Sequence, residues 1–181
     1  VRVSDGAGSD EESISIEVLD VVEGRVVDGP VSGATVTLVD ASGEVVNEIQ
    51  TNADGFWLVT DEIDLTGLQV RSQGGTDTST GKELPELFLV SALPSDGATE
   101  VNVNAVTTVL SVADVAEQQD ILEALGIDTS PDALISTDIW ERAVAGDIVA
   151  KQAQRVNSQL NVVLSTTQTI VSSVSGGQAD G

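Results

Sequence analysis

The chain has 181 residues, of which 40% are hydrophobic, and this composition excludes a disordered tail. It contains no His, Cys, Met or Tyr, which excludes Cys or His nucleophiles, His general bases, haem, iron–sulfur clusters and ordinary zinc sites. Thirty acidic and seven basic side chains give a net charge of −23, a sign that repels nucleic acids and anionic membranes. We therefore expect a protein that is not an enzyme and binds no nucleic acid.

The environment of the protein follows from the same charge. A net charge of −23 is tolerable in high salt, or where carboxylates hold divalent cations, and both conditions indicate a secreted or cell-surface protein. No apolar run approaches the roughly 20 residues that span a bilayer, so we expect no membrane insertion. Because the sequence begins with Val1 rather than Met, we expect a piece of a longer protein with any signal peptide upstream.

The first hundred residues carry 20 acidic and 4 basic side chains and have the pattern of short strands cut by Gly, Pro and Asp turns. A first hairpin is predicted to pair residues 1–3 with 14–18 across the acidic loop 5–12. Further strands are predicted at 25–27, 34–39, 45–51, 56–60, 68–71, 86–92 and 100–103. We interpret residues 52–55 as a hairpin turn and residues 74–81 as a structural loop. This spacing favours an antiparallel β-sandwich.

From Thr107 the apolar period changes to that of helices. Gly126 is predicted to end one helical region, and Ser130 with Pro131 is predicted to begin a short helix as N-cap and first residue. Another helix is predicted at 137–145, and the last and longest begins after Gly146 and Asp147. The fold class is therefore α+β, with a sandwich followed by a helical subdomain that ends in a long helix.

The last helix carries a heptad pattern and an unusual lack of acidic residues. No acid occurs from Ile148 to Ala179, whereas a solvated helix of this protein would be expected to share its acidic coat. We infer that much of this helix is covered, and we predict that its apolar seam is an interface with another copy or module. The candidate interface residues are Val149, Val156, Leu160, Val163 and Ile170.

Two stretches resemble modules of bacterial surface proteins. Residues 23–36, with Asn52-Ala53-Asp54-Gly55-Phe56, resemble the start of a carboxypeptidase-regulatory-like or collagen-adhesin B-type immunoglobulin-like module, and residues 1–22 resemble the last hairpin of a cadherin-like repeat. The resemblance implies a module of a large secreted adhesin or matrix protein, with neighbouring modules or copies of itself as partners. We therefore expect four parts: a hairpin from a cadherin-like repeat or donated strands (1–22), an Ig-like sandwich (23–103), a helical subdomain (104–175) and a flexible tail (176–181).

Calcium is the cofactor that the residue types permit, because Ca²⁺ takes carboxylate and carbonyl oxygens. Asp5, Asp10 and Glu12 share one acidic loop, and the cadherin-like resemblance implies Asp20 and Glu23 as ligands at the module junction. A third acidic cluster lies at 61–64. The alternative for each cluster is a solvated acidic loop.

We therefore expect a calcium-stabilised, self-associating structural module. Two alternatives remain: a carbohydrate- or peptide-binding module that uses the sandwich loops, and an accessory domain of a secreted hydrolase. With only two Trp and two Phe in the chain, an aromatic platform for sugars is scarce. We predict that Trp57 and Trp140 are core residues.

Overall fold

The computed structural model describes residues 2–4, 9–11, 21–60, 63, 65, 67–95 and 97–176, with the backbone alone at 2–4, 9–11 and 172–176. Twelve strands and five helices occur in this part of the chain. The strands are β1 (Arg2–Ser4), β2 (Ser9–Glu11), β3 (Val22–Val27), β4 (Val31–Ser32), β5 (Thr35–Val39), β6 (Val45–Gln50), β7 (Phe56–Val59), β8 (Gln69–Gln73), β9 (Thr76–Asp77), β10 (Lys82–Glu83), β11 (Phe88–Ala92) and β12 (Val103–Asn104). The helices are α1 (Ala105–Ser111), α2 (Val115–Ala124), α3 (Pro131–Ile135), α4 (Ile139–Val144) and α5 (Ile148–Gly176). The predicted α+β class is confirmed at this level.

The strands form three sheets besides the β1–β2 pair, with the orders β11-β8-β5-β6, β12-β3-β7 and β10-β9-β4. The four-stranded sheet is antiparallel throughout. One pair departs from the predicted antiparallel arrangement, because β12 lies parallel to β3. A parallel pair needs a long crossover, and here the rest of the β-rich part of the chain supplies it.

One hydrophobic cluster joins the four-stranded sheet to the sheet around β3. Its apolar side chains alternate along the strands, as the period of two requires. They include Val22 and Val26 of β3, Val36 and Leu38 of β5, Trp57 and Val59 of β7, Val70 of β8 and Leu89 of β11. Trp57 is buried as predicted, and Trp140 packs against a second cluster made mainly by the helices. Leu160 of α5 packs against both clusters, so the long helix is part of the core.

The turns explain why the strands end where they do. Asp40 accepts hydrogen bonds from the main-chain N–H groups of Ser42 and Glu44 and closes the β5–β6 hairpin. The prediction of a hairpin turn at 52–55 is wrong, since β6 and β7 lie in different sheets. Asn52 still accepts hydrogen bonds from Asp54 and Phe56. The turn therefore carries the chain from one sheet to the other.

The first hairpin also differs from its prediction. β1 pairs with β2, with Arg2 opposite Glu11, so residues 9–11 form the second strand instead of the predicted acidic loop. The predicted partner strand 14–18 lies outside the described residues.

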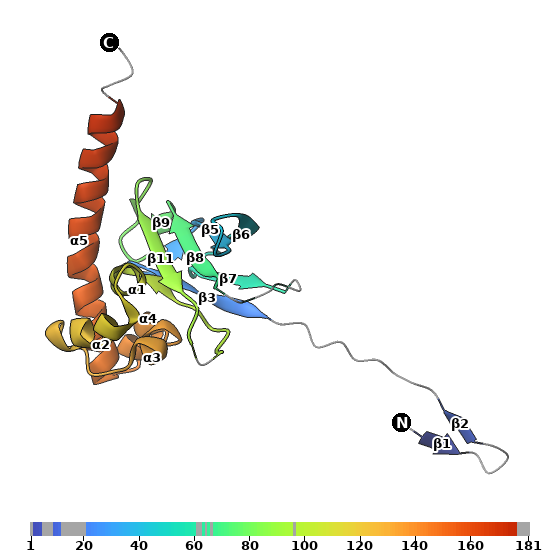
Figure 1. The fold of residues 1–181 in the computed structure, drawn as a ribbon. Coiled ribbons are helices and arrows are strands. Elements are labelled where there is room, and N and C mark those ends of the chain that lie inside the picture. The colour runs from blue at the N-terminus through green and yellow to red at the C-terminus, as the bar shows by residue number, and fades with distance from the viewer. Residues whose placement is uncertain are drawn as a thin grey trace.

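Polar side chains cap several of the helices, and the cap at Ser130 is the one that the sequence predicts. Ser130 accepts a hydrogen bond from Ala133 N–H and Pro131 opens α3, as predicted. Asn104 and Thr107 form a capping box, which starts α1 directly after β12. Helices α1 to α4 gather around the N-terminal half of α5, whose C-terminal half continues beyond them along the sheets (Figure 1). Within the described residues, no helix combines the length and hydrophobicity of a membrane span.

A buried ion pair joins the sheet to the helices. The Arg25 guanidinium of β3 lies 2.8 Å from the Asp138 carboxylate, and both side chains are about nine-tenths buried. Arg25 also stacks on Phe56, 3.8 Å from the ring centroid. Asp138 has a second role, since its other oxygen accepts a hydrogen bond from Glu141 N–H and caps α4. The ion pair thus fixes α4 on β3.

Replacing Gly24 by Ala is expected to destabilise the fold by about 1–3 kcal/mol. Gly24 lies on β3, where a Cβ atom would stand 1.9 Å from the Val101 carbonyl oxygen. Because that oxygen belongs to the backbone, β3 and the segment before β12 would have to separate. Urea unfolding followed by tryptophan fluorescence, to which buried Trp57 contributes, measures the effect. The neighbouring control Glu23→Ala removes an exposed side chain and should change stability by less than about 0.5 kcal/mol.

Candidate functional site

The long helix α5 binds the β-rich part through amide side chains. Asn157 is completely buried. Its side-chain oxygen accepts a hydrogen bond from Ala105 N–H at 2.8 Å, and its side-chain nitrogen donates to the Val27 carbonyl at 3.1 Å. One amide therefore joins α5 to the end of β3 and to the first residue of α1.

Three further amides extend this contact along α5. Gln154 donates to the Asp28 carbonyl, and Asn161 donates to the Asp28 carboxylate at 2.7 Å. Gln168 donates to the Phe88 carbonyl and accepts from Phe88 N–H. Because β11 is an edge strand, Gln168 occupies main-chain groups that would otherwise be open to another strand. These amides are spaced by three, four and seven residues, which places them on one helix face.

The predicted seam on α5 divides into buried and exposed positions. Val156 is buried, and Leu160 packs against both hydrophobic clusters, so these two have little surface to offer a partner. Val149 is 36% exposed, whereas Val163 and Ile170 are 61% and 57% exposed. The inference that much of the helix is covered therefore holds for its N-terminal half, where the covering comes from the same chain.

The C-terminal half of α5 carries an exposed apolar face, formed by Val162, Val163, Ile170 and Val171. Each of these side chains is more than half exposed. No charged residue occurs from Val156 to the end of the helix. In a chain with a net charge of −23, this face is a large uncharged surface on a regular element.

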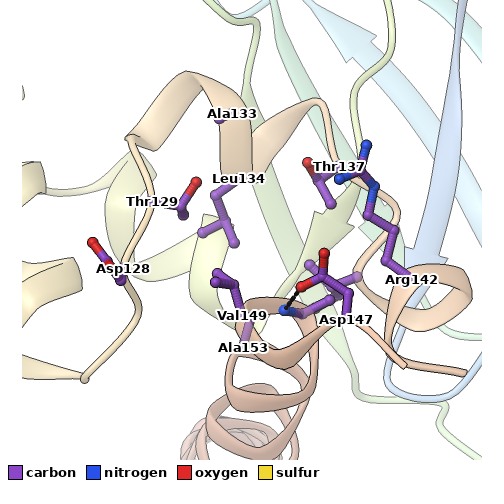
Figure 2. Close-up of a pocket in the computed structure, with 11 residues that line it drawn as sticks. Asp128, Thr129, Ala133, Leu134, Thr137, Arg142, Asp147, Val149 and Ala153 are labelled. Atoms are coloured by element: carbon purple, nitrogen blue, oxygen red, sulfur yellow. Dashed lines mark hydrogen bonds between the residues drawn. The ribbon is translucent and has the colours of Figure 1, made fainter. Parts of the chain in front are cut away.

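A small pocket lies between α3, α4 and the start of α5 (Figure 2). Its volume is about 180 Å³, below the roughly 300–1,000 Å³ of ordinary small-molecule sites. Asp147 and Arg142 lie at one side of it (Figure 2). Asp147 accepts a hydrogen bond from Ala150 N–H and so caps α5. The Asp147 carboxylate in this pocket therefore has a structural role, which is to cap the first turn of α5.

Most of the predicted calcium ligands cannot be placed. Asp5, Glu12, Asp20 and the cluster at 61–64, except Ile63, lie outside the described residues, and only the backbone of Asp10 is described, in β2. Glu23 is exposed on β3 and forms a parallel bridge with Glu100. Among the side chains that the structure describes, no three carboxylates gather at one point.

Two carboxylates from distant segments do meet beside α5. Asp28 follows β3 and Asp77 ends β9. Burial raises the pKa of Asp28, the hydrogen bond from Asn161 lowers it and the Asp77 charge raises it further, with a net upward shift. Burial also raises the pKa of Asp77, but hydrogen bonds from Ser79 and Thr80 outweigh burial and lower it. The surrounding protein therefore stabilises the negative charge of Asp28 less than that of Asp77.

Two further findings concern the sugar-binding alternative and the segment 74–81. Trp57 is only 2% exposed, so it cannot be the aromatic platform of a sugar site. Residues 74–81 include β9, and Thr78 donates to the Pro30 carbonyl, so this segment holds the turn after β3.

Comparisons of the chain with models of protein families, with curated proteins and with solved structures find no match.

Proposed function

We propose that the protein is a non-enzymatic structural module of an extracellular adhesin or matrix protein. In this proposal its β-rich part is an Ig-like sandwich braced by α5, and the C-terminal half of α5 binds a second copy of the chain. The absence of His and Cys from the sequence and its net charge of −23 are compatible with such a role. The observation that carries the proposal is the exposed apolar face of Val162, Val163, Ile170 and Val171.

The charge distribution favours a second copy as the occupant of this face. Copies of a chain with a charge of −23 repel each other over most of their surfaces. Contact through the uncharged half of α5 brings no carboxylate of this helix segment to the interface. In an antiparallel pair, Lys151 and Arg155 of one helix would lie toward the C-terminal end of the other, where the helix dipole favours positive charge. Val163 and Ile170 are seven residues apart, a spacing that suits a helix pair.

Sedimentation velocity over a range of protein concentrations tests this proposal. We expect a concentration-dependent dimer, and the double variant Val163→Glu/Ile170→Glu should raise its dissociation constant at least about tenfold, because two charges on each helix would be desolvated. Val115 of α2 is 83% exposed, so Val115→Glu is a matched control that should leave the dimer unchanged. A wild-type chain that stays monomeric up to millimolar concentration would refute the self-association.

A further inference from the structure

Three oxygen-bearing side chains from distant parts of the sequence lie around the turn after β3, where α5 crosses the β-rich part. Asp28 lies in the turn after β3, Asp77 lies on β9, and Asn161 lies in the middle of α5. The Asn161 amide is 2.7 Å from the Asp28 carboxylate. The Asp77 carboxylate lies against the backbone that follows Asp28, since a Cβ atom at Gly29 would be 2.4 Å from its Oδ1.

Of the two carboxylates at this place, Asp28 is incompletely neutralised, whereas hydrogen bonds from Ser79 and Thr80 stabilise the charge of Asp77. The mutual repulsion of the two carboxylates and the burial of Asp28 both disfavour the charged state of Asp28. Lys82 is a basic side chain near both carboxylates. It lies opposite Asp77 in the β9–β10 pair, and its positive charge stabilises the negative charge of Asp28. Lys82 is exposed, so water and salt screen its effect.

Two amide oxygens beside Asp28 are buried without a hydrogen-bond partner. Asn161 is only 3% exposed, and its amide nitrogen bonds the Asp28 carboxylate while its Oδ1 atom has no partner. The Oε1 atom of Gln154 is also buried without a partner, and the Nε2 atom of the same side chain donates a hydrogen bond to the Asp28 carbonyl. A buried oxygen without a donor destabilises the fold, and a cation or an ordered water would remove this penalty.

We propose that Asp28, Asp77 and the Asn161 Oδ1 atom bind one Ca²⁺ ion, which fastens the middle of α5 to the β-rich part. All three donors are hard oxygens, and Ca²⁺ accepts 6–8 of them in irregular geometry with water in the remaining positions. Mg²⁺ requires a near-ideal octahedron and suits such a mixed set less well. With two carboxylates, the expected dissociation constant is about 0.1–1 mM, the range of extracellular calcium modules.

An NMR titration of the whole chain with CaCl2 at constant ionic strength tests the site. The side-chain amide resonances of Asn161 should shift saturably with Ca²⁺, and more weakly with Mg²⁺. Asp28→Asn should weaken Ca²⁺ binding at least about tenfold, because it removes one of two charged ligands. Lys82→Gln should strengthen binding, because it removes a competing positive charge. Asp54→Asn, in an exposed turn, is the matched control and should bind as the wild type does.

The titration distinguishes a calcium ion at this place from a water molecule and from calcium bound elsewhere on the chain. If a water molecule satisfies Asn161, its amide resonances will not respond to Ca²⁺, and the proposal fails. If the acidic residues elsewhere bind the ion, Asp28→Asn and Asp54→Asn will have the affinity of the wild type, and the proposal also fails. The Lys82→Gln variant retains all three ligands, so unchanged affinity in this variant counts against the site even where Asp28→Asn does not fold.

Discussion

The Asp138→Asn variant is expected to lose about 3–5 kcal/mol of unfolding free energy, because it leaves the Arg25 guanidinium buried without its counter-charge. The pair is separated by 2.8 Å, and each side chain is about 10% exposed or less. Asn retains the side-chain oxygen that caps α4, so the loss reports the ion pair and not the cap. Urea unfolding at pH 7 measures the loss.

Two further variants make this prediction specific. Glu141→Gln removes an exposed charge from the first turn of the same helix and should cost less than about 0.5 kcal/mol. The double variant Arg25→Met/Asp138→Asn should be more stable than Asp138→Asn alone, because no unpaired charge remains buried. A stability of Asp138→Asn within about 0.5 kcal/mol of the wild type would show that water reaches Arg25 and that the pair is dispensable.

Local signals in the sequence predict the elements that local chemistry controls. The strand predicted at 34–39 forms as β5, with Val36 and Leu38 buried, and the helix predicted to begin at Ser130 and Pro131 forms as α3. Both signals act within a few residues. The short strands β4 and β9 are not among the predicted elements. Their two-residue pairing depends on main-chain hydrogen bonds between segments about 45 residues apart, which no periodicity encodes.

Long-range pairing explains the other differences. The parallel contact of β12 with β3 joins Val103 to Val26, and the Asn52 turn crosses between sheets because β7 pairs with β3 instead of β6. In each case the strand itself is predicted and its partner is not. Alternation fixes which face of a strand is buried, but it does not choose the neighbouring strand.

The face of α5 that contacts the β-rich part is marked in the sequence by Asn and Gln residues, which an analysis of hydrophobic periodicity does not count. The apolar seam indicates a covered helix, and the acid-free composition supports this. The amides at 154, 157, 161 and 168 form a second stripe at helical spacing. These residues make the hydrogen bonds to the β-rich part, whereas Val163 and Ile170 of the seam remain exposed. A stripe of Asn and Gln beside an apolar seam can thus mark an intramolecular contact.

The Asn157→Ala variant is expected to destabilise the protein by about 2–5 kcal/mol, since it leaves two buried main-chain groups without partners at about 1–3 kcal/mol each. These groups are the Ala105 N–H and the Val27 carbonyl. The higher helix propensity of Ala offsets only about 0.5 kcal/mol of this loss.

The neighbouring variant Gln159→Ala gives the control for this effect, because Gln159 is exposed on the same turn of α5. It should leave stability within about 0.5 kcal/mol of the wild type. Asn157→Asp separates the two hydrogen bonds, since it keeps an acceptor for Ala105 N–H but sets a carboxylate against the Val27 carbonyl, and it should destabilise at least as much as Asn157→Ala. Thermal and urea unfolding of the three variants measure these differences. Equal stability of Asn157→Ala and Gln159→Ala would mean that α5 is held by its apolar contacts alone, with no requirement for the amide bridge.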